Sequence, residues 1–188
     1  MNLFDLLLMV TRQLEQQQIL HVLTGSLASS YYGQPRASQD ADIALRMTRR
    51  QAKIFASAFD QSIYVSEEGL LHAIEQAGMT NIIHGASGWV IDLSVLPLSP
   101  FFNEVFARRR RIELDDEPET AIWISAPEDV ILMKLLWRTE SRSAKQLEDA
   151  INAAVGQRAQ LDWSYLRRWA SELGISDDLE EIRKGCDD

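Results

Sequence analysis

The chain has 188 residues, of which 46% are hydrophobic and 25% are charged, and its formal net charge at pH 7 is −9. These values are typical of a globular protein with a sizeable core, and the acidic balance argues against a protein that grips nucleic acid with its whole surface. A single cysteine, Cys186, excludes a disulfide framework or a cysteine-based metal cluster within the chain.

The first residues, MNLFDLLLMVTRQLEQQQ, predict an amphipathic helix rather than a signal peptide. Leu3, Leu7, Val10 and Leu14 recur with the helical period and share one face. The stretch lacks the basic region and the small-residue cleavage site of a secretory signal. No run approaches the roughly 18–20 apolar residues of a membrane span. We therefore expect a cytoplasmic protein without membrane contact.

Hydrophobic periodicity and turn residues predict a mixed α/β segment after this helix. Its predicted elements are a strand at 19–25, a helix at 26–33, a strand at 40–47, a helix at 49–59, a strand at 62–66, a helix at 66–78 and a hairpin at 80–96. Two further strands, RRRRIEL and TAIWIS, flank an acidic turn at 115–119.

From residue 126 onward the pattern is helical only, with helices predicted at 126–138, 143–156 and 162–173. Ser125 and Glu128 have the spacing of a capping box at the start of the first of these helices. The sequence thus predicts an α/β (α+β) fold. A mixed sheet flanked by helices occupies residues 1–125, and a helical subdomain packed on it occupies residues 126–188.

The strand DADIAL presents two carboxylates on one face, because residues i and i+2 of a strand point the same way. Asp40 and Asp42 form this pair, while Ala41 and Ile43 face the core. Adjacent anions repel unless they are protonated or bridged by cations, and hard oxygen ligands suit Mg²⁺. An Asp-x-Asp pair by itself also fits a solvated strand end.

A third acid, Asp92, interrupts the apolar run GWVIDLSVL. Charged residues are rarely buried unless they are paired. If this strand lies beside the strand of Asp40 and Asp42, three carboxylates converge, as in two-metal catalysis of displacement at phosphorus. The alternative is that Asp92 faces solvent on a half-exposed strand.

Gly25 and Ser26 end the first apolar strand and begin a helix. Glycine allows a tight turn and close approach of a ligand, and the N–H groups of a helix N-terminus bind phosphate. Arg36, between this turn and the carboxylates, is a candidate phosphate ligand. A plain strand-turn-helix connection and a surface arginine are the alternatives.

Lys134 lies in the apolar helix segment VILMKLLW. A lysine in such surroundings must extend to solvent, lose its proton or meet an anion. The anion is either a nucleotide phosphate or a neighbouring acid, of which Asp149 on the next helix is the candidate. Both roles are compatible, with Asp149 orienting Lys134.

The stretch GSLASSYYGQPRASQDADIAL, followed by Asp92, resembles the signature of the polymerase-β-like nucleotidyltransferase superfamily. That signature is a Gly-Ser pair, a spacer, an Asp-x-Asp pair and a third carboxylate on a later strand. Residues 124–150 resemble the AbiEii-type toxin nucleotidyltransferases and their uncharacterised bacterial relatives. The resemblance covers nearly the whole chain and implies a nucleotidyltransferase-type sheet.

The resemblance implies an enzyme that transfers a nucleoside monophosphate from an NTP to an acceptor hydroxyl and releases pyrophosphate. Asp40, Asp42 and Asp92 would bind Mg²⁺, in two ions, or Mn²⁺, and Asp92 would also act as the base. Gly25, Ser26, Arg36 and Lys134 would bind the nucleotide, with Asp149 in support. The active site is expected in the cleft between the α/β segment and the helical segment.

The acceptor stays open at this stage. The toxin-like resemblance implies tRNA or a protein side chain, and a cognate antitoxin or other partner protein. A small acceptor, as in the aminoglycoside nucleotidyltransferases, and a non-catalytic nucleotide-binding or antitoxin-like role are the alternatives. The basic run Arg108–Arg111 fits either a contact with an RNA backbone or a solvated strand edge.

Overall fold

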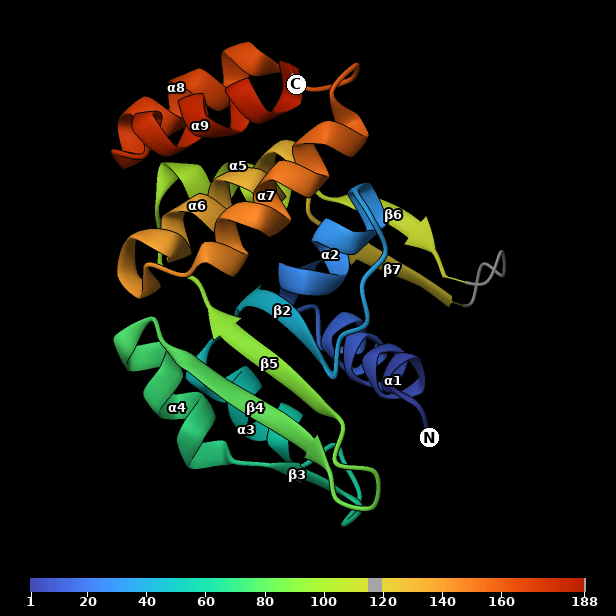
Figure 1. The fold of residues 1–188 in the computed structure, drawn as a ribbon. Helices are drawn as coiled ribbons and strands as arrows, with labels where there is room; N and C mark the ends of the chain where they lie inside the picture. Colours follow the sequence, from blue (N-terminus) through green and yellow to red (C-terminus); the bar gives the residue numbers. More distant parts are fainter. Residues whose placement is uncertain (115–119, 188) are drawn as a thin grey trace. The chain divides into compact units, whose positions relative to one another are not determined.

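The computed structural model describes residues 1–114 and 120–187, so the predicted turn at 115–119 lies outside the described residues. Two compact units make up the chain: Met1–Thr24 with Ser38–Ile124, and Gly25–Ala37 with Ser125–Asp188 (Figure 1). Residues 25–37, which the sequence assigns to the α/β segment, group with the helices of the second unit.

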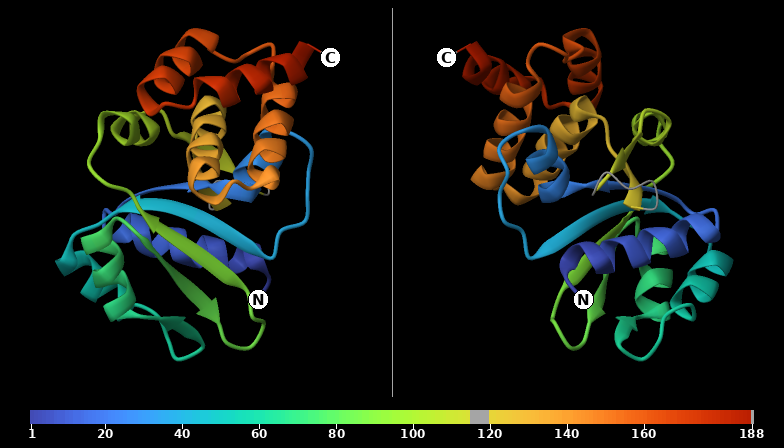
Figure 2. Two further views of the ribbon diagram at one scale, coloured as in Figure 1. Left: turned by 60° about the vertical axis from the view of Figure 1, so that its left-hand side comes forward. Right: turned by 90° about the vertical axis from the view of Figure 1, so that its right-hand side faces the viewer.

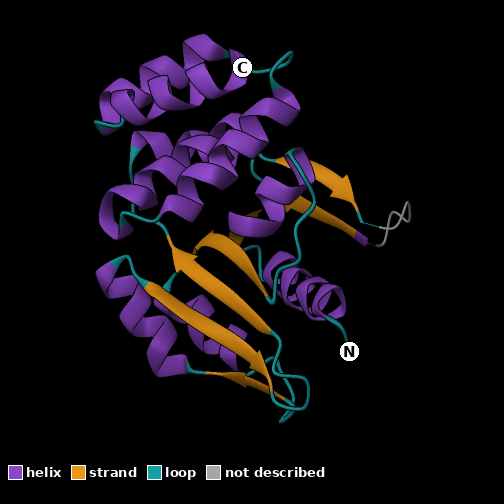
Figure 3. Cartoon of the chain, viewed as in Figure 1, coloured by secondary structure: helices purple, strands orange, loops and turns teal. Residues whose placement is uncertain are grey.

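The first unit contains a seven-stranded mixed sheet with the order β3-β4-β5-β2-β1-β7-β6 (Figure 3). Its strands are β1 (Leu20–Thr24), β2 (Asp40–Arg46), β3 (Ile63–Val65), β4 (Met79–His84), β5 (Val90–Val95), β6 (Arg110–Glu113) and β7 (Ala121–Ile124). The pairs β2–β5 and β1–β7 are parallel, and the other neighbours are antiparallel. The α/β fold class predicted from the sequence is confirmed.

Four helices accompany this sheet in the described part of the first unit: α1 (Leu3–Gln16), α3 (Arg49–Ala56), α4 (Glu67–Gln76) and α5 (Pro100–Ala107). Figure 2 shows α1, α3 and α4 on one face of the sheet, and α1 packs against β1, β2 and β5. The predicted apolar face of α1 is buried, and Asn2 with Asp5 forms its capping box.

The helix α5 is absent from the sequence prediction, although a local signal for it exists. Ser99 caps the helix by accepting a hydrogen bond from the backbone N–H of Phe102 at 3.2 Å, and Pro100 occupies the first turn. A serine followed by proline at the first helical position is a typical helix start.

The second unit is helical in its described residues. Its helices are α2 (Gly25–Tyr32), α6 (Pro127–Ser141), α7 (Ala144–Gln157), α8 (Trp163–Leu173) and α9 (Ser176–Asp187). The helices predicted at 126–138, 143–156 and 162–173 correspond to α6, α7 and α8. In Figure 2, α8 and α9 lie side by side, and they pack against each other.

The predicted capping box at the start of α6 is wrong. The N-cap residue is Ala126, and no side chain caps this end of the helix. Glu128 instead accepts a hydrogen bond from the backbone N–H of Asp162 at 3.0 Å. Pro127 at the first helical position has no N–H group, so this helix start has one donor fewer to satisfy.

The helix α6 is buried around its whole circumference between Val130 and Leu135. A helix that is apolar on all sides belongs in the interior of a protein, which explains why VILMKLLW lacks an amphipathic pattern. Lys134 lies inside this segment and is only 3% exposed. Its charge therefore requires a partner within the fold.

The helices α2 and α7 cross at close range, because two glycines remove the side chains that would separate them. A Cβ atom on Gly33 would lie 2.5 Å from the carbonyl oxygen of Asn152, and one on Gly156 would lie 2.2 Å from that of Tyr32. Gln157 also donates a hydrogen bond to the carbonyl oxygen of Tyr32 at 3.1 Å.

Replacing Gly156 with alanine is expected to lower the free energy of unfolding by about 1–3 kcal/mol, the usual cost of overpacking. The clash involves the backbone of α2 and outweighs the roughly 1 kcal/mol that alanine gains over glycine in a helix. Gly185→Ala is the matched control, since its Cβ atom would meet Ile151 at 3.6 Å, an ordinary contact. Urea unfolding measures both variants, and equal stability of the two would contradict the prediction.

Candidate active site

The strand β2 presents Asp40 and Asp42 on the same face. Both are half-buried, whereas Ala41 and Ile43 between and after them are fully buried. This alternation confirms the predicted orientation of the strand. The strand itself is internal, with β1 on one side and β5 on the other.

The strand β5 brings the third carboxylate to the same place. It runs parallel to β2, and in this register Asp92 lies directly opposite Asp42. Asp92 is half-buried, with Ile91 and Leu93 buried on the other face. The three carboxylates therefore converge as predicted, because the strand of Asp92 lies beside the strand of Asp40 and Asp42.

The electrostatic consequence appears at Asp92. Burial raises the pKa of its carboxyl group, and the negative charges of Asp42 and Asp40 raise it further. Both causes disfavour the ionised form. Asp92 therefore holds a proton more readily than an ordinary aspartate, and a cation placed here would favour its ionised form.

Ser38 also contributes to the carboxylate cluster, a role that was not predicted from the sequence. Its hydroxyl donates a hydrogen bond to Oδ1 of Asp40 at 2.8 Å and holds that carboxylate from one side. A serine two residues before an aspartate is a recognisable local signal, since short polar side chains often bond to near neighbours in loops.

The donor set is chemically suited to Mg²⁺, which prefers carboxylate oxygens and usually takes only one or two of them, with phosphate and water completing its shell. Among residues 1–114 and 120–187, however, no group of three or more His, Cys, Asp or Glu side chains is arranged to hold one metal ion together. The adjacent carboxylates of Asp42 and Asp92 are two donors of this kind.

The Gly-Ser turn follows directly on β1. Thr24 ends the strand opposite Asp42, and Gly25, the next residue, starts α2 with φ of +63°. This left-handed conformation is one that glycine adopts without steric cost. Ser26 lies in the first turn of the helix, and its Oγ accepts a hydrogen bond from Arg36 at 3.1 Å.

Within the second unit, three charged residues form one network. Nζ of Lys134 lies 2.8 Å from Oδ2 of Asp149, and Nη2 of Arg36 lies 3.2 Å from the same oxygen. The side chains of Lys134 and Asp149 are 4% and 7% exposed, whereas that of Arg36 is 38% exposed. The network has two positive charges and one negative, and Arg36 carries the charge that solvent reaches.

The ammonium group of Lys134 therefore faces Asp149 in this structure. Of the two predicted partners, the neighbouring acid is the one observed, and a direct contact of Lys134 with phosphate stays a prediction. Arg36 and Asp149 also line a pocket of about 190 Å³. Its remaining lining is polar apart from one proline: Ser29, Ser30, Gln34, Pro35, Glu148 and Asn152.

The structure thus brings the predicted site residues together in two groups. The carboxylates Asp40, Asp42 and Asp92 lie together in the first unit, and Gly25, Ser26, Arg36, Lys134 and Asp149 belong to the second. The peptide bond between Thr24 and Gly25 joins the strand next to the carboxylates to the helix of the second group. A cleft formed by both groups stays a prediction.

The basic run Arg108–Arg111 leads into β6, which is the terminal strand of the sheet. Arg109 and Arg111 lie over the ring of Trp123, and Arg111 also pairs with Glu15 at 2.6 Å. The strand-edge interpretation is confirmed, since charged side chains protect exposed edges. A contact with nucleic acid stays a prediction.

In the described ranges of the chain, none of the helices has the length and apolar character needed to cross a membrane.

Comparison with known proteins identifies solved structures with a similar fold. No protein-family model matches the chain, and no curated protein matches it. The crystal structure of an antigenic nucleotidyltransferase-like protein from Paracoccidioides brasiliensis is similar, with 16% identity, a TM-score of 0.59, and coverage of 98% of this chain and 93% of that one. The solution structure of the antibiotic-resistance factor ANT(2'')-Ia is similar with 10% identity, a TM-score of 0.53, and coverage of 96% and 99%. The chain has the fold of nucleotidyltransferase-like proteins.

Proposed function

We propose that this protein is a metal-dependent nucleotidyltransferase that moves a nucleoside monophosphate from an NTP to an acceptor hydroxyl. One observation carries the proposal. In a fold similar to that of nucleotidyltransferase-like proteins, the parallel pairing of β2 and β5 places Asp92 opposite Asp42, with Asp40 on the same face. Carboxylates gathered in this way need a cation or a proton to offset their repulsion.

Asp40, Asp42 and Asp92 are proposed to bind two Mg²⁺ ions, with Mn²⁺ as a substitute. When bound, the metal would neutralise charge on the phosphates and stabilise the displacement at phosphorus. Ser38 keeps Asp40 in position through its hydrogen bond of 2.8 Å. These residues are suited to a cation that arrives together with the triphosphate.

Asp92 is proposed to take the proton of the acceptor hydroxyl, because burial and the neighbouring carboxylates raise its pKa and so favour its protonated form. The acceptor oxygen forms a bond to the α-phosphorus, and the bond from that phosphorus to the bridging oxygen of pyrophosphate breaks. The proton moves to Asp92, and pyrophosphate leaves with the electron pair of the broken bond.

The nucleotide phosphates are proposed to bind at the start of α2, where Gly25 and Ser26 offer backbone N–H groups. Arg36 is the exposed cation of the charged network and the proposed direct phosphate contact. Asp149 holds Arg36 in place and is itself paired with the buried Lys134, whose positive charge would favour bound phosphate.

The resemblance to AbiEii-type toxins supports tRNA or a protein side chain as the acceptor, and an antitoxin as a partner. A small cationic acceptor is the second candidate. It is supported by the similarity to the antibiotic-resistance factor ANT(2'')-Ia and by the net charge of −9, which attracts cations.

The test is label transfer from α-labelled NTPs, with Mg²⁺, Mn²⁺ or EDTA, to total tRNA, lysate protein or a panel of aminoglycosides. Transfer to one acceptor class is expected with metal and is expected to fall by about a thousandfold in Asp42→Asn. Asp60→Asn is the control, since Asp60 is an exposed acid outside the site. No transfer to any acceptor, together with NTP binding that Asp42→Asn leaves unchanged, would point to a non-catalytic nucleotide-binding role.

A further inference from the structure

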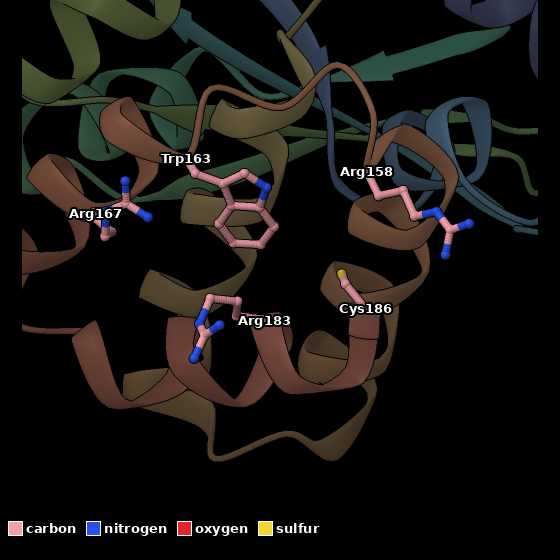
Figure 4. Close-up of a pocket in the computed structure, with 5 residues that line it drawn as sticks. All are labelled: Arg158, Trp163, Arg167, Arg183 and Cys186. Atoms are coloured by element: carbon pink, nitrogen blue, oxygen red, sulfur yellow. The ribbon is translucent and has the colours of Figure 1, made fainter. Parts of the chain in front are cut away.

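A second pocket lies in the helical unit, apart from the residues assigned above. Its volume is about 530 Å³, and it is lined by Arg158, Trp163, Arg167, Arg183 and Cys186 (Figure 4). These residues come from the C-terminal end of α7, from α8 and from α9. None of them belongs to the network of Arg36, Lys134 and Asp149. The size is typical of a pocket for a small organic ligand.

The pocket concentrates positive charge in a chain whose net charge is −9. Arg158 and Arg167 are exposed, and neither guanidinium has an ion-pair or hydrogen-bond partner among the described residues. Arg183 pairs with Glu180 at 3.0 Å, and its side chain is still 47% exposed. The lining therefore has an excess of cationic donors suited to a phosphate, which arginine binds through its planar fork.

Trp163 supplies a different kind of surface in the same pocket. Its side chain is half-buried, and in the view of Figure 4 Arg167 lies to the left of the indole ring, Arg158 to its right and Arg183 below it. An aromatic ring beside arginines is the combination by which proteins stack a base and bind the attached phosphate. Neither a phosphate ion alone nor an apolar ligand would use both features.

We propose that this pocket binds a nucleotide unit, with the base stacked on Trp163 and phosphate held by the arginine on either side of the ring, Arg158 or Arg167. The same chemistry is offered by a free mononucleotide and by one nucleotide of a single-stranded RNA. The site would be additional to the proposed catalytic site, and its occupancy would not require metal, because its donors are cationic.

The test uses the full chain carrying Asp42→Asn, in EDTA, so that binding at the proposed catalytic site is suppressed. AMP binding is measured by calorimetry, and binding of a labelled single-stranded RNA of about 12 nucleotides by fluorescence anisotropy. The variants are Arg158→Gln with Arg167→Gln, and Trp163→Leu. Arg168→Gln with Lys184→Gln is the control, since it removes the same charge from α8 and α9 outside the pocket.

Each pocket variant is expected to weaken binding of AMP, of RNA or of both by about tenfold, while the control pair leaves it within about twofold. The paired arginine change should also reduce the slope of log K against log salt concentration for RNA binding, by the amount expected for the loss of about two phosphate contacts. Loss confined to AMP identifies a free nucleotide as the source, and loss confined to RNA identifies the polymer. Binding of neither probe, or equal affinity of the pocket variants and the control pair, would overturn the proposal while leaving the transfer reaction untouched.

Discussion

Replacing Asp92 with asparagine is expected to remove nucleotide transfer and, at the same time, to stabilise the metal-free protein. Loss of the proposed base should lower the rate by about 10²–10⁴-fold. The ionised carboxylate is disfavoured by burial and by the charges of Asp42 and Asp40, and an amide of similar size relieves that cost. We expect a higher melting temperature at pH 7, by about 2–4 °C for each kcal/mol that is relieved.

The direction of the pKa shift of Asp92 determines how this stabilisation changes with pH. The pKa of Asp92 in the folded protein lies above the unfolded value of about 3.9, so the folded state binds its proton more tightly. The carboxyl group therefore stabilises the fold most at pH values below the unfolded pKa. This contribution is lost as the pH rises through the raised pKa of the folded protein. The difference in melting temperature between Asp92→Asn and the natural chain should be smallest near pH 4 and should grow as the pH rises through the raised pKa.

The control for this prediction is Asp60→Asn, which makes the same change in net charge at a site where the charge is favourable. Hydrogen bonds from Ser62 lower the pKa of Asp60, so its neutralisation should not raise the melting temperature. If both variants were stabilised equally, the cause would be the reduced net charge of the chain rather than relief within the cluster.

Replacing Asp149 with alanine is expected to lower the free energy of unfolding by about 3–5 kcal/mol. The substitution leaves Lys134 buried at 3% exposure without its carboxylate at 2.8 Å. An unpaired charge in the interior keeps its full desolvation cost. Urea unfolding followed by far-UV circular dichroism measures the loss.

Two further variants separate the parts of the network. Arg36→Gln should cost only about 0–1 kcal/mol, since its side chain is 38% exposed, but it should raise the KM for the NTP. Lys134→Met combined with Asp149→Leu should regain most of the stability, because apolar pairs can replace buried ion pairs. If the double variant were no more stable than Asp149→Ala, the loss would come from something other than the stranded lysine.

The two groups of residues have opposite electrostatic character, and this contrast underlies the proposed function. The cluster of Asp40, Asp42 and Asp92 carries excess negative charge, whereas the network around Asp149 carries excess positive charge. A metal-bound nucleoside triphosphate presents a cation and several anionic oxygens in one molecule. Taken separately, the carboxylates suit the cation of such a ligand, and the network suits its phosphates.

Local pattern was sufficient to predict the orientation of the carboxylates on β2. Alternation along DADIAL identified the face of Asp40 and Asp42, because the side-chain period of a strand is a property of the backbone. The buried lysine of α6 was equally visible in the sequence, because its neighbours are apolar on all sides. The start of α6 was not predictable from the local sequence. Ala126 is the N-cap residue, and Glu128 bonds to the backbone N–H of Asp162 instead of taking part in a capping box.

Local patterns in the sequence are therefore enough to identify paired aspartates on one strand face, a third acid in an apolar strand, and a lysine that needs an anion. Which of these residues meet depends on how the elements are arranged in the fold. The parallel placement of β5 beside β2 set Asp92 opposite Asp42, and packing brought Arg36 to Asp149, 113 residues away. Local periodicity follows from backbone geometry, whereas partners distant in sequence are selected by strand order and by the packing of whole elements.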